Sequence, residues 1–232
     1  MTDEPQGAAP ALSPGIYLVA TPIGNMEDIT LRALRVLAQA EVLACEDTRV
    51  TRKLFGRHGL PAPKTLLACN DHNERTVAKR LVRFAAEGKV VAFCSDAGLP
   101  GISDPGYNIA REAREAGVPV EVIPGPGAVT TAVALCGVPA ASFTFLGFPP
   151  RRDGRLAALL TAHGSLRPAM VFYESPAASP AFSRRRRSIW EPVAKLPFAW
   201  NGRRNSRASF AAQRLTWRGR SRPRKRAATR GG

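Results

Sequence analysis

The chain has 232 residues and carries 34 Lys and Arg against 18 Asp and Glu, a formal net charge of +16. The length suits one large or two small domains, and no apolar run approaches the about 18 residues of a membrane span. The start, residues 1–14, is Pro/Ala-rich and lacks the basic and apolar regions of a signal peptide. We therefore expect a cytoplasmic protein.

The charge is concentrated at one end of the chain. Residues 1–176 hold 18 basic and 17 acidic side chains, whereas residues 177–232 hold 16 basic side chains and a single acid, Glu191. A basic tail on a neutral domain is typical of a nucleic-acid-binding arm. The first 176 residues are long enough to bury a hydrophobic core of their own.

The four cysteines indicate a reducing compartment and predict no metal site. Cys45, Cys69, Cys94 and Cys136 show no CxxC spacing, and three of them lie in apolar runs. Such cysteines are typically small buried side chains. Cys69 and His72 alone are a poor set of zinc ligands.

Apolar runs and helical periods alternate along the first part of the chain. The first run, residues 15–20, predicts a strand that ends in a Pro/Gly turn. A helix is expected over residues 29–40, with Thr30 as its cap. Further strands are expected at residues 42–45, 65–69, 90–94 and 120–123, and further helices at residues 48–58, 73–87, 106–116 and 128–136. This alternation predicts a parallel sheet with right-handed crossovers.

The pattern changes after residue 139. Residues 143–148 alternate aromatic side chains at period two, which predicts a half-buried strand of a second sheet. Its aromatic residues, Phe143, Phe145 and Phe148, are expected in the core. A helix over residues 155–163 and a strand over residues 169–174 follow.

These elements predict an α/β protein of two domains. The expected parts are a disordered N-terminus at residues 1–13, an N-terminal α/β domain with a parallel sheet at residues 14–126, and the start of a second α/β domain with an incomplete mixed sheet at residues 127–176.

Two Gly/Pro-rich loops follow strand-like runs. They span residues 94–106 and 123–128. In an open α/β sheet, the loops at the carboxyl ends of the strands form the ligand crevice, and glycines let the backbone approach a ligand closely. Neither loop contains GxxxxGK(S/T) or GxGxxG, so the sequence supports no triphosphate or NAD site.

Eight short motifs occur in order along the chain. They are Thr21-Pro22-Ile23-Gly24-Asn25, Glu46-Asp47-Thr48-Arg49, Asn73-Glu74-Arg75, Ser95-Asp96-Ala97-Gly98, Ile102-Ser103-Asp104-Pro105-Gly106, Ile123-Pro124-Gly125-Pro126, Gly147-Phe148-Pro149-Pro150 and Phe172-Tyr173-Glu174-Ser175-Pro176. Their order and spacing closely resemble the ribosomal RNA methyltransferases of the tetrapyrrole (corrin/porphyrin) methylase superfamily. The resemblance covers residues 14–176, and it is specific because all eight motifs fall in order.

The resemblance implies two α/β domains with S-adenosylmethionine bound between them. It implies methyl transfer to the ribose 2′-oxygen of a cytidine in small-subunit ribosomal RNA, with the 30S subunit as partner, a homodimer, and no membrane. By similarity, the residues expected to contact the cofactor are Pro22, Ile23, Gly24, Asp96, Ala97, Gly98, Gly127, Ala128 and, from the second domain, Tyr173.

These residue types suit a cofactor that carries a sulfonium cation and no phosphate. A backbone-lined pocket with few charges spares the positive charge of the sulfonium, and methyl transfer depends mostly on positioning. Structural explanations exist as well. Gly98, Gly101 and Gly106 are also common as turn glycines, and Asp96 and Asp104 as helix caps or turn formers.

The sequence does not identify the catalytic base. A ribose hydroxyl is a poor acid, so either a base takes its proton or the proton leaves late to water. Glu46, Asp47 and His72 are the candidates, because they follow strand ends on the side where the crevice should open. Alternatively, Glu46, Asp47 and Arg49 form a helix cap with a local ion pair, and His72 is a surface or capping residue.

A basic face on the helix expected at residues 48–58 is a candidate RNA contact. Arg49, Arg52, Lys53 and Arg57 recur every three to four residues and could contact phosphates. A solvated helix face explains the same pattern.

Residues 177–232 depart from the family. Family members continue with a His-Arg pair, a helix and a later Glu-Leu-Thr-Lys stretch, whereas here Arg, Ala, Ser, Pro, Gly and Trp dominate and the periodicity ends. A disordered segment read out of frame and a genuine basic RNA-binding tail both explain this composition. The first would impair the activity of the chain.

Two other functions stay open on the sequence. One is a small-molecule C-methyltransferase of the tetrapyrrole kind, and the other is a basic RNA-binding protein on an inactive methylase fold. The motifs at residues 46–49 and 73–75 favour RNA as the substrate.

Overall fold

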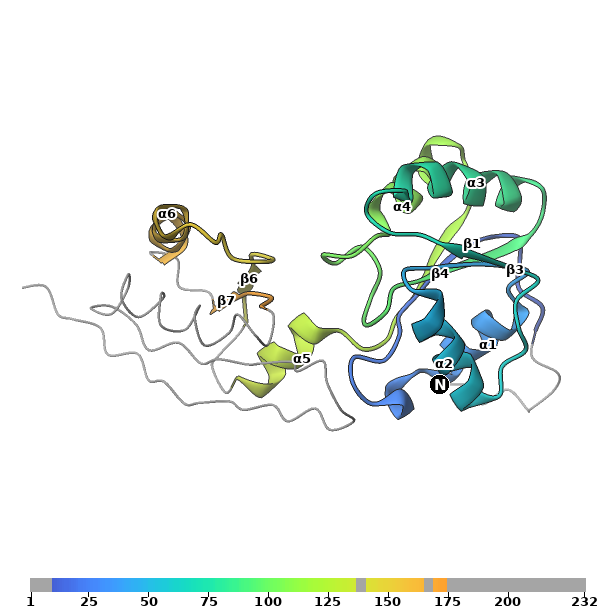
Figure 1. The fold of residues 1–232 in the computed structure, drawn as a ribbon, viewed down its shortest axis with the longest axis horizontal. Coiled ribbons are helices and arrows are strands. Elements are labelled where there is room, and N and C mark those ends of the chain that lie inside the picture. Colours follow the sequence, from blue (N-terminus) through green and yellow to red (C-terminus); the bar gives the residue numbers. More distant parts are fainter. Residues whose placement is uncertain (1–9, 137–140, 165–168, 175–232) are drawn as a thin grey trace, which may run out of the picture. The chain divides into compact units, whose positions relative to one another are not determined.

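Five parallel strands form the sheet of the first unit, in the order β3-β2-β4-β1-β5 (Figure 1). They are β1 (Gly15–Val19), β2 (Val42–Cys45), β3 (Thr65–Ala68), β4 (Val90–Cys94) and β5 (Val120–Ile123). All four strand pairs of this sheet run parallel, as the alternation of strands and helices predicted. The structure is a computed structural model and describes residues 10–136, 141–164 and 169–174.

Helices cover both faces of this sheet (Figure 1). They are α1 (Leu31–Gln39), α2 (Thr48–His58), α3 (Glu74–Ala86) and α4 (Tyr107–Glu115), and a short 3-10 helix, η1 (Met26–Asp28), precedes α1. On one face, Leu37 of α1 and Leu54 of α2 share a core cluster with Tyr17 and Val19 of β1. On the other face, α3 and α4 pack on the alternate residues of β1, with Leu81 and Ile109 fully buried.

The ends of the helices follow local sequence signals. The amide of Ala33 donates to Thr30 Oγ1 at 3.0 Å, which confirms Thr30 as the cap of α1. Helix α2 ends at Gly59, whose φ of 62° requires a residue without a Cβ penalty. Helix α4 ends at its cap, Ala116, and Gly117 follows with a φ of 68°.

The second unit holds a two-stranded sheet of β6 (Phe143–Phe145) and β7 (Ala169–Val171) with helix α6 (Asp153–Gly164). The two strands pair in parallel, and Leu156 and Leu160 of α6 are buried with Met170 and Phe172 packed against them. Within residues 141–164 and 169–174 no other strand is present, so the mixed character of this sheet stays a prediction.

The strand predicted over residues 143–148 was too long. Strand β6 ends at Phe145, and Gly147 turns the chain with a φ of 62°. The alternation therefore does not bury Phe148, which is 62% exposed, and Phe143 at the start of the strand is 39% exposed. The core position predicted for these two rings was wrong. Phe148 lies beyond the end of the strand, where a period-two pattern no longer applies, and Phe143 is the exposed first residue of β6.

The described residues divide between Thr131 and Ala132, within helix α5 (Ala128–Leu135), a few residues after the predicted boundary at 126/127. The N-terminal segment predicted as disordered, residues 1–13, overlaps the described part of the chain. There Leu12 packs against the core and its amide donates to Gln39 Oε1 at 3.1 Å. The predicted out-of-frame tail, residues 177–232, lies outside the described residues. Among the helices of the described ranges, none has the length and apolar character needed to cross a membrane.

Candidate functional site

The loops that follow β1, β2, β4 and β5 lie along one edge of the sheet. These four strands are adjacent and parallel, so their carboxyl ends point the same way. The loops carry residues 20–25, 46–47, 95–106 and 124–127. The loops predicted to form the crevice therefore follow adjacent strands along one edge of the first unit.

A pair of backbone hydrogen bonds joins the β1 loop to the β4 loop. The amide of Thr21 donates to the Gly98 carbonyl, and the amide of Gly98 donates to the Thr21 carbonyl, both at 3.0 Å. The hydroxyl of Thr21 also donates to the carbonyl of Ser95 at 3.0 Å. Three bonds thus fix Thr21 against the loop that contains Asp96 and Ala97.

Gly98 is where three of the predicted cofactor segments meet. Its φ is +89°, and an added Cβ would lie 3.5 Å from Ile23 Cγ2 and 3.9 Å from the Pro126 carbonyl oxygen. Pro126 directly precedes Gly127 and Ala128, so the β1, β4 and β5 loops lie in van der Waals reach of this glycine. These two nearest atoms, an apolar carbon and a carbonyl oxygen, suit a cationic cofactor without phosphates.

The carboxylates after β2 and β4 bind each other's backbone. The amide of Asp47 donates to Asp96 Oδ1 at 2.9 Å, and the amide of Asp96 donates to Glu46 Oε2 at 3.2 Å. Each carboxylate therefore accepts a hydrogen bond from a backbone amide of the neighbouring loop. Asp96, predicted to contact the cofactor, also holds the β2 loop in place.

Asp47 is the cap of α2 and the partner of Arg49, as the alternative reading of this motif proposed. The amide of Arg49 donates to Asp47 Oδ1 at 2.8 Å, and Arg49 Nη2 lies 2.7 Å from Asp47 Oδ2. The Arg49 side chain lowers the pKa of the Asp47 carboxyl to about 2. A carboxylate with such a pKa is a weak proton acceptor at neutral pH, so Asp47 is poorly suited as a general base.

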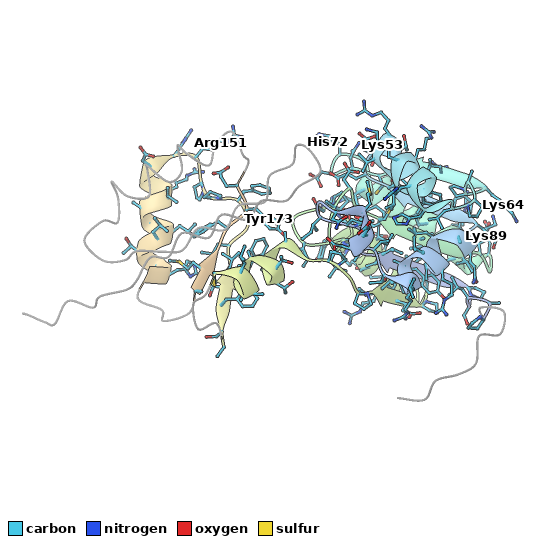
Figure 2. The ribbon with its side chains drawn as sticks, turned by 90° about the horizontal axis from the view of Figure 1, so that it is seen from below. Lys53, Lys64, His72, Lys89, Arg151 and Tyr173 are labelled. Atoms are coloured by element: carbon cyan, nitrogen blue, oxygen red, sulfur yellow. The ribbon has the colours of Figure 1, made fainter. Side chains whose placement is uncertain are left out.

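His72, the third candidate base, lies in a turn after the edge strand β3. Its amide donates to Asn70 Oδ1 at 3.1 Å, and the residue is exposed. Figure 2 labels His72 and Lys53, and both lie at the periphery of the first unit. This placement fits a surface turn residue, the alternative that the sequence left open.

The predicted RNA-contacting residues lie on the solvent side of α2. Arg49 has an 83% exposed side chain although it pairs with Asp47, and Arg52 and Lys53 are exposed as well. Their helix neighbours Thr51, Leu54 and Phe55 are buried. The helix thus has one buried face and one cationic face.

Tyr173 belongs to the second unit. Its ring makes edge contacts with Phe145 and Phe148, at centroid distances of 4.8 Å and 5.7 Å, and its amide donates to the Gly147 carbonyl at 2.9 Å. These contacts hold the ring just beyond the carboxyl end of β7.

A cavity of about 30 Å³ lies beneath the loops of the first unit. Its lining consists of Thr21, Pro22, Met26, Val50, Thr51, Leu54, Cys94, Ser95 and Asp96. That volume is room for about one water molecule and not for a nucleoside.

Three cysteines lie just below the same loops. Cys45 and Cys94 are register partners in β2 and β4, and the amide of Cys69 donates to the Cys45 carbonyl at 2.8 Å. Burial raises the pKa of Cys69 to about 12, and it also raises the pKa of Cys45 and Cys94. These thiols are therefore structural. Within the described ranges, no group of three His, Cys, Asp or Glu residues could hold a metal ion.

Glu74 belongs to the motif at residues 73–75, but the sequence reasoning did not predict its contact with α4. It is 6% exposed, and its carboxylate accepts hydrogen bonds from Gly106 and Asn108 at the start of α4. A sequence signal was present, because α4 begins at a glycine and has no capping side chain of its own.

Comparison with known proteins identifies the family. The model of the tetrapyrrole (corrin/porphyrin) methylases matches residues 15–220. Relatives named ribosomal RNA small subunit methyltransferase I include proteins of Halalkalibacterium halodurans (44% identical over 161 residues, 69% of this chain and 55% of that protein), Vibrio cholerae (45% over 179 residues, 76% and 60%) and Thermotoga maritima (44% over 161 residues, 69% and 71%). The chain spans little more than half the length of several of these relatives.

Solved structures show the same fold at lower identity. The methyltransferase CobJ superposes with a TM-score of 0.62 at 21% identity, covering 88% of this chain and 86% of that one. The cobalt precorrin-4 methyltransferase CbiF superposes with a TM-score of 0.54 at 16% identity, covering 77% and 78%. Methyltransferases of this family take their methyl group from S-adenosylmethionine. The chain therefore belongs to the tetrapyrrole (corrin/porphyrin) methylases and, within them, to the ribosomal RNA small subunit methyltransferase I family.

Proposed function

We propose that this chain is a methyltransferase that uses S-adenosylmethionine to methylate small-subunit ribosomal RNA, at the ribose 2′-oxygen of a cytidine. The observation that carries the proposal is the meeting of Ile23, Gly98 and Pro126 at the carboxyl edge of the sheet, in a chain whose relatives are named for rRNA methylation.

The first unit supplies a fixed wall for the cofactor. Two backbone hydrogen bonds hold Gly98 against Thr21, and the missing Cβ of Gly98 leaves space beside Ile23. When bound, the cofactor supplies the electrophilic methyl group. The residues of the first unit orient it, and the resemblance assigns Tyr173 of the second unit to the same cofactor.

Methyl transfer to the ribose oxygen would release the hydroxyl proton, which a base or water would take. Asp47 is the least suited of the three candidate bases, because Arg49 holds its pKa at about 2. Glu46 and His72 remain candidates, and methyl-transfer assays of Glu46→Gln and His72→Gln separate them.

The exposed cationic face of α2, with Arg49, Arg52 and Lys53, supports RNA as the substrate. We propose that these side chains contact phosphates of the ribosomal RNA. We further propose a homodimer that acts on the 30S subunit in the cytoplasm; size-exclusion chromatography with light scattering tests the dimer.

The test of the function is methyl transfer from labelled S-adenosylmethionine to 30S subunits, with a porphyrinoid offered in parallel. Label in the 2′-O-methylcytidine fraction of the RNA is the expected result. Label in the porphyrinoid alone would instead establish a small-molecule C-methyltransferase. Salt-sensitive RNA binding without any cofactor binding would establish an RNA-binding protein on an inactive fold.

The Arg-rich tail, residues 177–232, governs how active the chain is. We propose that it is read out of frame, because its composition becomes Arg-rich immediately after Pro176, although the family model matches as far as residue 220. Restoring the frame after Pro176 should then raise a weak activity. Full activity of the chain as written, lost when residues 177–232 are deleted, would show instead that the tail is a genuine RNA-binding arm.

A further inference from the structure

Glu74 is a buried carboxylate with three donors directed at it. It is 6% exposed, and its Oε1 accepts from the amides of Gly106 at 2.7 Å and Asn108 at 2.9 Å. Its Oε2 accepts from Asn108 Nδ2 at 2.5 Å. An acid this deeply buried is unfavourable unless its charge is met by such donors, so the contact is specific rather than incidental.

The donors lie where the β4 loop, residues 95–106, enters α4. Gly106 is the cap position of α4 and has no side chain to bind the helix amides. Glu74, in the first turn of α3, supplies the missing acceptor from a separate helix. Its negative charge also faces the positive end of the α4 dipole, which adds to the stabilisation.

The β4 loop is constrained along its whole length. At its start, Gly98 pairs with Thr21. Near its end, the amide of Gly101 donates to the Pro105 carbonyl at 3.0 Å, and a Cβ on Gly106 would lie 2.7 Å from the Gly101 nitrogen. The exposed turn between Gly101 and Pro105 contains Ser103 at a φ of 61°, which is a strained value for a residue with a side chain.

A loop with a strained turn keeps one shape only if both of its ends are held. Thr21 holds one end and Glu74 holds the other. We propose that Glu74 is a positioning residue for the cofactor site: its carboxylate fixes the β4 loop so that Asp96, Ala97 and Gly98 meet the cofactor in one arrangement. The inference rests on the proposed function.

The test compares Glu74→Ala and Glu74→Gln with Glu87→Gln in the full chain. Glu87 is a matched control, because it lies at the other end of α3 and pairs with the exposed groups of Arg83 and Lys89. Calorimetry measures the affinity for S-adenosylmethionine, hydrogen exchange measures protection of the Gly106 and Asn108 amides, and thermal unfolding measures stability.

Glu74→Ala should weaken cofactor binding by about tenfold or more, because it removes a charged acceptor from three donors. Glu74→Gln keeps an oxygen for the two amides, so about a threefold loss is expected; this variant also serves if the alanine variant does not fold. Exchange at Gly106 and Asn108 should accelerate in both variants, and Glu87→Gln should match the unchanged protein.

Three results would overturn the inference. Affinity within about twofold of the unchanged protein in both Glu74 variants, despite faster exchange at Gly106, would make Glu74 only a helix cap. An equal loss of cofactor affinity in Glu87→Gln would show that the effect comes from removing any negative charge and not from the contacts of Glu74. An unchanged protein without measurable cofactor affinity would refute the proposed function itself, and the inference with it.

Discussion

The carboxylate of Asp96 accepts a hydrogen bond from the backbone amide of Asp47 at 2.9 Å, so a side chain after β4 holds the backbone after β2. These two strands are neighbours at the centre of the sheet. Asp96 therefore has two roles: its carboxylate holds the β2 loop in place, and it is proposed to contact the cofactor.

Substitutions of Asp96 test its structural role and its role in cofactor binding separately. Asp96→Ala leaves the Asp47 amide without its acceptor, which should lower the free energy of unfolding by about 1–3 kcal/mol, and it should abolish cofactor binding. Asp96→Asn retains an acceptor oxygen and should lose less stability. Denaturant titration and calorimetry check both, with the exposed Asp71→Ala as control. Undiminished cofactor affinity in Asp96→Ala would remove this loop from the site.

Gly98→Val should damage the site by strain and by filling space. A side chain at a φ of +89° costs about 1–3 kcal/mol, and its Cβ would lie 3.5 Å from Ile23 before the valine methyls are counted. We expect lower stability and no cofactor binding. Gly56→Ala is the contrast: it lies inside α2 with open space around it, so about 0.5–1 kcal/mol of added stability is expected. Similar effects at both positions would contradict the prediction.

The ion pair of Asp47 and Arg49 predicts a stability change only in strong acid. The pKa of Asp47 is lowered from 3.8 to about 2 in the folded chain. The contribution of this carboxylate to the free energy of unfolding is therefore complete above pH 3.8 and is lost as the pH falls through about 2. Arg49→Ala should raise this pKa only part of the way, since the amide hydrogen bond to Asp47 stays. Carboxyl titration by NMR measures it. A titration of Asp47 near neutral pH would restore it as a candidate base.

The cationic face of α2 predicts a salt-dependent contribution to RNA binding. Arg52→Ala with Lys53→Ala should weaken RNA affinity and lower the slope of log K against log salt by about one for each lost phosphate contact. Lys79→Ala with Arg80→Ala removes an equal pair of exposed, adjacent charges from α3, on the other face of the sheet. If both pairs change the slope equally, the α2 face has no special role.

The sequence predicted the first sheet well because its signals are local. Each strand is an apolar run that ends at a turn residue, and α1 and α2 each begin at a capping side chain, Thr30 and Asp47. The Asp47–Arg49 pair was anticipated as an alternative for the same reason, since its partners are two residues apart. Phe148 was misplaced because a glycine ended the strand before the pattern did.

Contacts between distant segments could not be predicted in this way. Glu74 and Gly106 are 32 residues apart in the chain, and an acid in the first turn of a helix ordinarily serves its own helix. Only the packing of α3 beside α4 brings this carboxylate to the Gly106 amide. The pairing of Thr21 with Gly98 likewise depends on β1 and β4 being neighbours in the sheet.

The reactivity of the buried thiols of Cys45, Cys69 and Cys94 reports transient opening of the carboxyl edge of the sheet. A thiol whose pKa is raised by burial reacts with a labelling reagent only when the surrounding structure opens. The partly exposed Cys136 should therefore be labelled first, and the other three at the rate at which the strand ends separate. Any ligand that binds only the closed edge should slow those three reactions and leave Cys136 unaffected.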